Sequence, residues 1–203
     1  MTERAASAES TVTAPLKTTG HRLTLESLLA QLVTDALVTK EDADKLLKDR
    51  RASYGEHHPL VTISEQKFKD PRHPKKLLNL DTLTEWLAEK SGLPYMHVDP
   101  FKVDFAAVTK LMSTAYAQRF RILPVGVNTR EATIATCEPY VRDWEDQLKQ
   151  VLRLEIRRVI ANPVDIQNYI VEFFNLARSV KSAGEKDKGA YSGIGNFEQL
   201  VQL

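Results

Sequence analysis

Between residues 81 and 178 the hydrophobic pattern changes period several times, and this alternation constrains the fold more than any other feature of the chain. Four short runs have the length and residue types of strands: LPYMHV, RILPVGV, EATIAT and EIRRVIA. The segments between them carry apolar residues three and four positions apart, which is the spacing of an amphipathic helix. We therefore predict an α+β fold in which residues 81–178 form a compact domain, a sheet of three or four strands packed with helices.

Helix ends in this domain are marked by residues with known local preferences. A helix over residues 81–91 is expected to end at Gly92, because glycine adopts the left-handed conformation that terminates helices. A second helix is predicted over residues 104–116 from its apolar stripe. The pair Asn162-Pro163 has the pattern of a helix start and predicts the last helix of the domain.

Two of the expected strands form a hairpin. RILPVGV and EATIAT flank the tripeptide Asn128-Thr129-Arg130, whose residue types favour a turn. Pro124 lies inside the first of these strands and has no N–H to donate to a neighbour. Its strand is therefore expected at the edge of the sheet, or to contain a bulge.

Residues 21–80 are expected to form a small helical subdomain that continues into a proline-containing linker. Thr24 and Thr39 are candidate N-caps for two amphipathic helices, and the run PLVTI that follows predicts a short extended piece. Residues 1–20 are rich in Ala, Ser and Thr and are expected to be a flexible tail. Residues 179–203, rich in Gly, Lys and Ser, are expected to be a linker.

Composition excludes several classes of function. The 28 basic and 27 acidic residues nearly cancel, so no overall field favours nucleic acid, and we predict no nucleic-acid partner. Cys137 is the single cysteine, which excludes an internal disulfide and a cysteine-based zinc site. No apolar run approaches the roughly 20 residues of a membrane span, and the first residues lack the apolar core of a signal peptide. We expect a soluble intracellular protein.

No constellation of residues indicates catalysis. The closest approach to a phosphate-binding loop begins at Gly184, but Ala190 and Tyr191 stand where Lys and Ser or Thr are required. His57 and His58 are adjacent and are expected in a surface loop, and Cys137 is expected to be a half-buried thiol at a strand end. We predict no catalytic, cofactor-binding or metal-binding residues in this chain.

A series of landmarks in fixed order carries a family resemblance. They are Trp86-Leu87-Ala88, Gly92-Leu93-Pro94-Tyr95, Asp99-Pro100, the run from Tyr116 to Phe120, Ile122-Leu123-Pro124-Val125, Ala135-Thr136, Glu138-Pro139 and the helix at Pro163. In their order and spacing they resemble the N-terminal domain of the type II secretion and type IV pilus assembly ATPases. In that family the domain precedes the ATPase, which is not found in this sequence.

The resemblance implies a docking and regulatory module rather than an enzyme. In the family this domain is thought to bind the cytoplasmic part of an inner-membrane platform protein and so couple ATP hydrolysis to export or pilus growth. The parent protein is expected to be a cytoplasmic hexameric ATPase, peripheral to the inner membrane, with ATP and Mg bound by the missing domain. Residues 179–203 would lead toward that domain.

If the domain docks in this way, exposed arginines are the candidate contacts, with ordinary solvated charge as the alternative. The candidates are Arg119, Arg121, Arg142, Arg153, Arg157 and Arg158.

The alternative function is a domain that senses cyclic di-GMP or another nucleotide. Many relatives carry a helical motif for this ligand, and SLLAQLVTDALVT resembles it in its apolar positions. Ser27 stands where the motif has arginine, and Leu29 and Ala36 stand where it has glycine. An arginine fork clamps phosphate and glycine permits close approach, so these changes argue against nucleotide binding.

Overall fold

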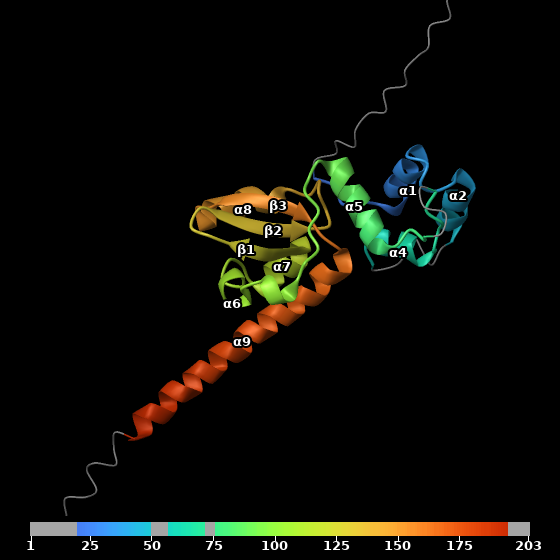
Figure 1. Ribbon diagram of the computed structural model, residues 1–203. Helices are drawn as coiled ribbons and strands as arrows, with labels where there is room; N and C mark the ends of the chain where they lie inside the picture. The colour runs from blue at the N-terminus through green and yellow to red at the C-terminus, as the bar shows by residue number, and fades with distance from the viewer. Residues whose placement is uncertain (1–19, 50–56, 72–75, 195–203) are drawn as a thin grey trace, which may run out of the picture.

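The computed structural model describes residues 20–49, 57–71 and 76–194, and in these it contains two hydrophobic cores. Figure 1 shows a helical part beside a part built around a sheet. The tail predicted over residues 1–20 lies outside the described residues except for Gly20. Among the described residues, no helix combines the length and apolar character needed to cross a membrane. The first core is built on α1 (Leu25–Thr34), α2 (Lys40–Lys48), α4 (Pro59–Glu65) and α5 (Leu80–Ser91).

The first two helices begin where the sequence predicts. The Thr24 hydroxyl accepts from the Ser27 N–H, and the Ser27 hydroxyl oxygen accepts from the Thr24 N–H, which makes a capping box. The Thr39 hydroxyl likewise accepts from the Asp42 N–H at the start of α2. Both predicted caps are confirmed, and the apolar stripes they fix face the first core.

The run PLVTI is helical, so the prediction of an extended piece is wrong. His58 caps α4, because its Nδ1 atom accepts from the Leu60 N–H at 3.2 Å, and Pro59 follows at the first helical position. Proline is well placed there, since its missing N–H would have no partner inside the helix and its fixed φ suits the first turn.

The sheet has three strands, β1 (Ile122–Val127), β2 (Glu131–Thr136) and β3 (Glu155–Ile160), in the order β1-β2-β3. β1 and β2 form the predicted antiparallel hairpin, and β3 runs parallel to β2. The Asn128 side-chain oxygen accepts from the N–H groups of Arg130 and Glu131 and fixes the turn. β1 is an edge strand with a register shift between Pro124 and Gly126, as the proline predicts.

The other helices pack around this sheet. α8 packs against β3, while α6, α7 and α9 pack against β1. They are α6 (Phe105–Val108), α7 (Thr114–Phe120), α8 (Asp143–Leu152) and α9 (Pro163–Ile194), and a short 3-10 helix, η1 (Pro100–Lys102), precedes α6. The Asn162 side chain caps α9 as predicted, accepting from the Val164 N–H.

Two local predictions in this domain are wrong. The run LPYMHV is not a strand: it meets β3 only at Ile160, through a single bridge from Tyr95. The expected helix over residues 104–116 is two helices, because the Ser113 hydroxyl accepts from the Tyr116 N–H and starts α7 anew.

The two cores do not divide at residue 80, where the sequence analysis places the start of the second domain. α5 packs in the first core, and its Trp86 indole N–H donates to the Asp35 carboxylate at 2.6 Å. Gly92 ends α5 with a left-handed φ of 67°, as predicted. The change from one core to the other therefore falls after α5, and Ile160 of β3 also belongs to the first core.

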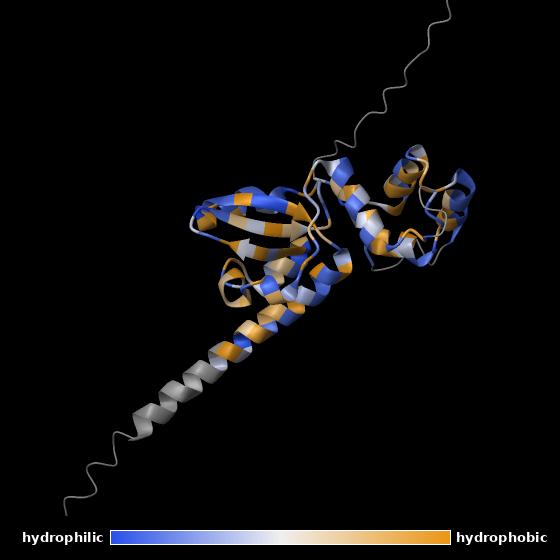
Figure 2. Cartoon of the chain, in the orientation of Figure 1, coloured by the Kyte–Doolittle hydropathy of each residue, from blue (hydrophilic) through white to orange (hydrophobic). Residues whose placement is uncertain are grey.

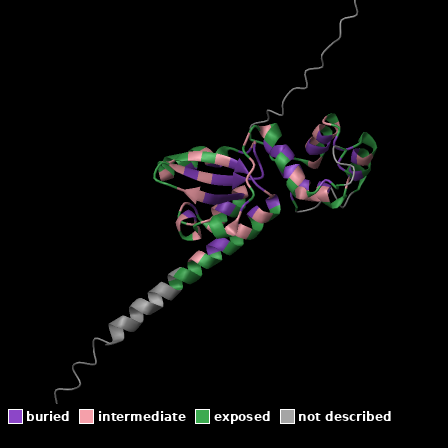
Figure 3. Ribbon diagram, viewed as in Figure 1, coloured by how far each residue is buried: buried purple, intermediate pink, exposed green. Residues whose placement is uncertain are grey.

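α9 is much longer than the packing of the sheet requires. Among its described side chains, the buried ones lie from Pro163 to Phe174, and Figure 3 shows the next stretch of the helix mostly exposed. Figure 2 shows further hydrophobic positions in this stretch. Leu176 and Val180 are large apolar residues there that are exposed. The segment predicted as a linker is thus helical as far as Ile194, the last described residue.

Candidate functional site

Two of the candidate arginines converge on one carboxylate. Arg142, at the start of α8, and Arg158, on β3, place their Nε atoms 2.8 and 3.3 Å from Glu145 Oε2. Arg158 also donates from Nη1 to the Pro139 carbonyl oxygen at 2.9 Å. This pair connects α8, β3 and the loop after β2, so its first role is structural.

Arg153 and Arg157 lie apart from that network. Arg153 ends α8 in a left-handed conformation, with φ 55°, and its side chain is exposed. Arg157 is exposed on β3, where Nη1 is 4.0 Å from Glu131 Oε1. Surface ion pairs of this kind add little stability, so both side chains are available to a partner.

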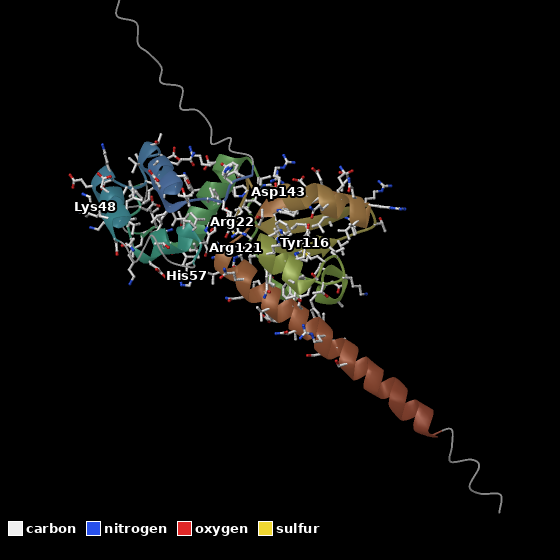
Figure 4. The ribbon with its side chains drawn as sticks, turned by 180° about the vertical axis from the view of Figure 1, so that it is seen from behind. Arg22, Lys48, His57, Tyr116, Arg121 and Asp143 are labelled. Carbon is white, nitrogen blue, oxygen red and sulfur yellow. The ribbon has the colours of Figure 1, made fainter. Side chains whose placement is uncertain are left out.

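Arg119 and Arg121 lie together at the C-terminal end of α7, and the structure adds Arg22 to them. Arg22 donates from Nη2 to the Arg119 carbonyl oxygen at 2.9 Å, and the Arg119 guanidinium lies 5.3 Å from the Phe120 ring centroid. Figure 4 shows Arg22 and Arg121 near each other where the helical part meets the sheet part. We call this group, Arg22, Arg119 and Arg121, the arginine corner.

Beside the arginine corner, His58 links the two cores. The residue is 2% exposed, and Nε2 donates to the Cys137 carbonyl oxygen at 3.2 Å. Because Nδ1 accepts from the Leu60 N–H, the proton resides on Nε2. Burial, together with the nearby Arg121, lowers the pKa of His58 to about 4. The ring is therefore neutral at neutral pH, and its 3.7 Å approach to Glu138 Oε1 is not an ion pair.

Glu138 is the buried carboxyl group of the junction. It is 2% exposed, and its Oε2 atom accepts from the Leu23 N–H at 2.8 Å, which holds the chain before α1 against the end of β2. Burial raises the pKa of Glu138, while the Leu23 hydrogen bond and the charges of Arg121 and Arg22 act to lower it. The junction thus combines a neutral imidazole, a buried carboxyl and the arginine corner.

Sequence reasoning missed Arg22 and Glu138 as parts of a site and misplaced His58. The signal for His58 was the following Pro59, the same helix-start pattern that Asn162-Pro163 revealed. Its neighbour His57 is exposed, as predicted for both. No local signal could reveal that His58 reaches Cys137, since the two are 79 residues apart.

A groove borders the arginine corner. It has a volume of about 270 Å³ and is lined by Gln118 and Arg121 from the end of α7 and by Gln167, Ile170 and Val171 of α9. Arg121 is half-buried and ends α7 with a left-handed φ of 53°.

A larger cavity, of about 740 Å³, lies in the helical part. Its walls come from the turn between α1 and α2 and from residues 67–71, and they carry Lys40, Lys67 and Lys69 beside apolar side chains. Ala36 also lines it and has a positive φ of 56°. This is the position at which the nucleotide motif has its second glycine.

The described residues offer no site of metal or thiol chemistry. They contain no group of three or more His, Cys, Asp or Glu side chains placed to hold a metal ion. Cys137 is fully buried rather than half-buried as predicted, and burial raises the pKa of its thiol to about 12. A thiol in that state is a poor nucleophile.

Comparison with known proteins shows which domain family and which proteins this chain is similar to. Residues 91–180 match the MshEN domain. The type IV pilus assembly ATPase TfpB of Acinetobacter baylyi (strain ATCC 33305 / BD413 / ADP1) is 36% identical over 180 residues, which are 86% of this chain. The chain spans only 30% of the length of TfpB.

Two solved structures are also similar. The structure of MshE with cdg has a TM-score of 0.46 and 20% identity over 75% of this chain and 99% of that one. The N-terminal domain of XpsE has a TM-score of 0.43 and 16% identity over 74% of this chain and 96% of that one.

Residues 91–180 of the α+β part thus match an MshEN domain, and the helical subdomain precedes them. Over 86% of its length the chain is homologous to part of the pilus assembly ATPase TfpB.

Proposed function

We propose that this chain is a non-catalytic docking and regulatory module of a secretion or pilus assembly ATPase. Its partner is the cytoplasmic domain of an inner-membrane platform protein, and docking couples the motor to export or pilus growth. The observation that carries the proposal is the 36% identity with a pilus assembly ATPase over 86% of this chain. On this proposal ATP and Mg are bound by another part of a hexameric, cytoplasmic parent that is peripheral to the inner membrane, and the chain itself needs no cofactor.

The exposed arginines are the candidate contacts for this docking. Arg119, Arg153 and Arg157 are exposed, and none of them holds two elements of the fold together as Arg158 does. Mutating exposed charges at an interface changes association more than it changes folding. These three are therefore the docking residues to test, and Arg142 and Arg158 are assigned to the Glu145 network.

Isothermal titration of the chain against the platform domain tests the proposal. We expect saturable one-to-one binding, at micromolar affinity or tighter, that weakens at least tenfold when Arg119, Arg153 and Arg157 are all changed to Gln. Arg130→Gln, an exposed arginine in the β1–β2 turn, is the matched control and leaves the affinity unchanged. Absence of binding by a folded chain would contradict the docking role.

Nucleotide sensing is the second candidate, because the cavity of about 740 Å³ is lined by three lysines and apolar residues in the part of the chain that resembles the cyclic di-GMP motif. A ligand that binds only the folded state raises the melting temperature. Thermal-shift measurements with cyclic di-GMP, ATP and GTP distinguish the two functions. A shift abolished by Lys67→Gln and Lys69→Gln together would favour sensing, whereas no shift at millimolar nucleotide supports docking alone.

A further inference from the structure

The groove beside the arginine corner contains a guanidinium without a partner in the protein. Within the described residues, no hydrogen bond or ion pair engages the side chain of Arg121. Arginine carries five N–H donors in a planar fork and no acceptor. The Arg121 nitrogens are not among the described buried atoms that lack a partner, so they reach solvent and are open to an acceptor that comes from outside.

The position of Arg121 is set by the fold rather than by its side chain. Its backbone N–H caps α7 and its φ is 53°, a left-handed conformation that costs a residue other than glycine about 1 kcal/mol. The α7 end packs against α9, which brings Arg121 to the same groove as Gln167 and Ile170. The guanidinium is therefore presented at a defined place between two helices.

The electrostatic surroundings favour an anion. Arg22 and Arg121 both act to lower the pKa of Glu138, so both positive charges lie near that group. Burial opposes them and raises the pKa of Glu138. No ion pair within 4.0 Å joins Glu138 to either arginine among the described residues. The arginine corner thus keeps an excess of positive charge at the mouth of the groove.

We propose that this groove binds a carboxylate on a short aliphatic stem, namely an acidic side chain of the docking partner. The fork of Arg121 matches a carboxylate bidentately, and the amides of Gln118 and Gln167 offer further donors. Ile170 and Val171 supply apolar walls for the methylene groups of the stem. A volume of about 270 Å³ is ample for such a side chain, since one water takes roughly 30 Å³. That the carboxylate belongs to the docking partner rests on the proposed docking function.

The first test uses glutarate as the probe, a dicarboxylate with the stem length of a glutamate side chain. Titration is followed by NMR of the side-chain amides of Gln118 and Gln167, which a merely structural role of Arg121 would not perturb. We expect saturable shifts in wild type, at least tenfold weaker binding in Arg121→Gln, and partial recovery in Arg121→Lys. Arg130→Gln is the control. Equal binding by wild type and Arg121→Gln, or preference for inorganic phosphate over glutarate, would overturn the proposal.

The second test separates this site from the docking function itself. Arg121→Gln is titrated against the platform domain and against a short glutamate-containing peptide. Loss of affinity for both supports the acidic side chain as the ligand. If Arg121→Gln binds the platform domain as tightly as wild type, the groove is not part of the docking interface. That outcome overturns the groove proposal and leaves the docking function intact. Glutarate binding that depends on Arg121, with no binding of the platform domain, establishes a site for a free carboxylate and overturns the partner assignment.

Discussion

His58 Nε2 donates to the carbonyl oxygen of Cys137 at 3.2 Å, and this bond joins the helix that His58 caps to the loop that leaves the central strand. The ring is buried and neutral, with its other nitrogen occupied by the Leu60 N–H. A ring protonated on both nitrogens could not accept from Leu60, so protonation would break the α4 cap and place a charge in the buried contact between the two cores.

Stability is expected to fall as the pH falls from about 6.5 to about 4. In the unfolded chain His58 binds a proton near its ordinary pKa of 6.5, whereas in the folded protein its pKa is lowered to about 4. The unfolded state therefore binds more protons within that window, and the free energy of unfolding decreases by about 3 kcal/mol across it. Above pH 6.5 the group contributes no pH dependence.

The measurement is urea unfolding at several pH values, for wild type and for His58→Asn, which cannot titrate but can still cap α4. The difference between the two curves isolates His58 from the carboxyl groups. A difference that stays constant between pH 6.5 and 4 would show that the ring is not buried in its neutral form.

Glu138→Gln and Glu138→Ala are expected to differ in sign or size at neutral pH. Burial raises the pKa of Glu138, so the charged form is disfavoured in the folded state. The contribution of Glu138 to the free energy of unfolding therefore decreases as the pH rises through its folded pKa. Glutamine keeps an oxygen for the Leu23 N–H without the charge, so Glu138→Gln should be neutral or stabilising. Alanine leaves that buried N–H unpaired and should cost about 1–3 kcal/mol. Chemical denaturation at pH 7 decides between them.

Ala36→Gly is expected to stabilise the fold by about 0.5–1 kcal/mol, because Ala36 has a φ of 56° and glycine adopts that conformation without strain. The matched control is Ala30→Gly, at an exposed position inside α1, which should destabilise by about 1 kcal/mol. Differential scanning calorimetry of both variants gives the comparison. Equal destabilisation by the two changes would exclude a left-handed Ala36.

Arg158→Ala should destabilise more than Arg142→Ala, although both side chains reach Glu145. Arg158 is half-buried and also donates to the Pro139 carbonyl oxygen, so its removal leaves that carbonyl of a buried residue without this donor and should cost about 1–3 kcal/mol. Arg142 is exposed, and its loss should cost less than about 1 kcal/mol. A double-mutant cycle with Glu145→Ala measures each coupling, and equal costs would contradict this division of roles.

Short-range interactions were readable from the sequence. The caps at Thr24, Thr39 and Asn162 bond N–H groups two or three residues away, and the Asn128 turn closes within three. Two wrong predictions, the single helix over residues 104–116 and the extended run PLVTI, also depend on local signals. The Ser113 cap and the helix start at His58-Pro59 are just as short in range, but they were overlooked. The α+β class followed from periodicity, which each segment carries in itself.

For the candidate site, the sequence by itself determined which side chains carry charge and which turns place them at helix ends. Only the tertiary structure decided that Arg142 and Arg158 share Glu145, that Arg22 joins Arg119, and that His58 is buried against Cys137. These contacts join separate elements, and packing alone fixes burial and with it the pKa of a group. A charge pattern could therefore name the arginines, but it could not tell which of them, such as Arg158, hold separate elements of the fold together.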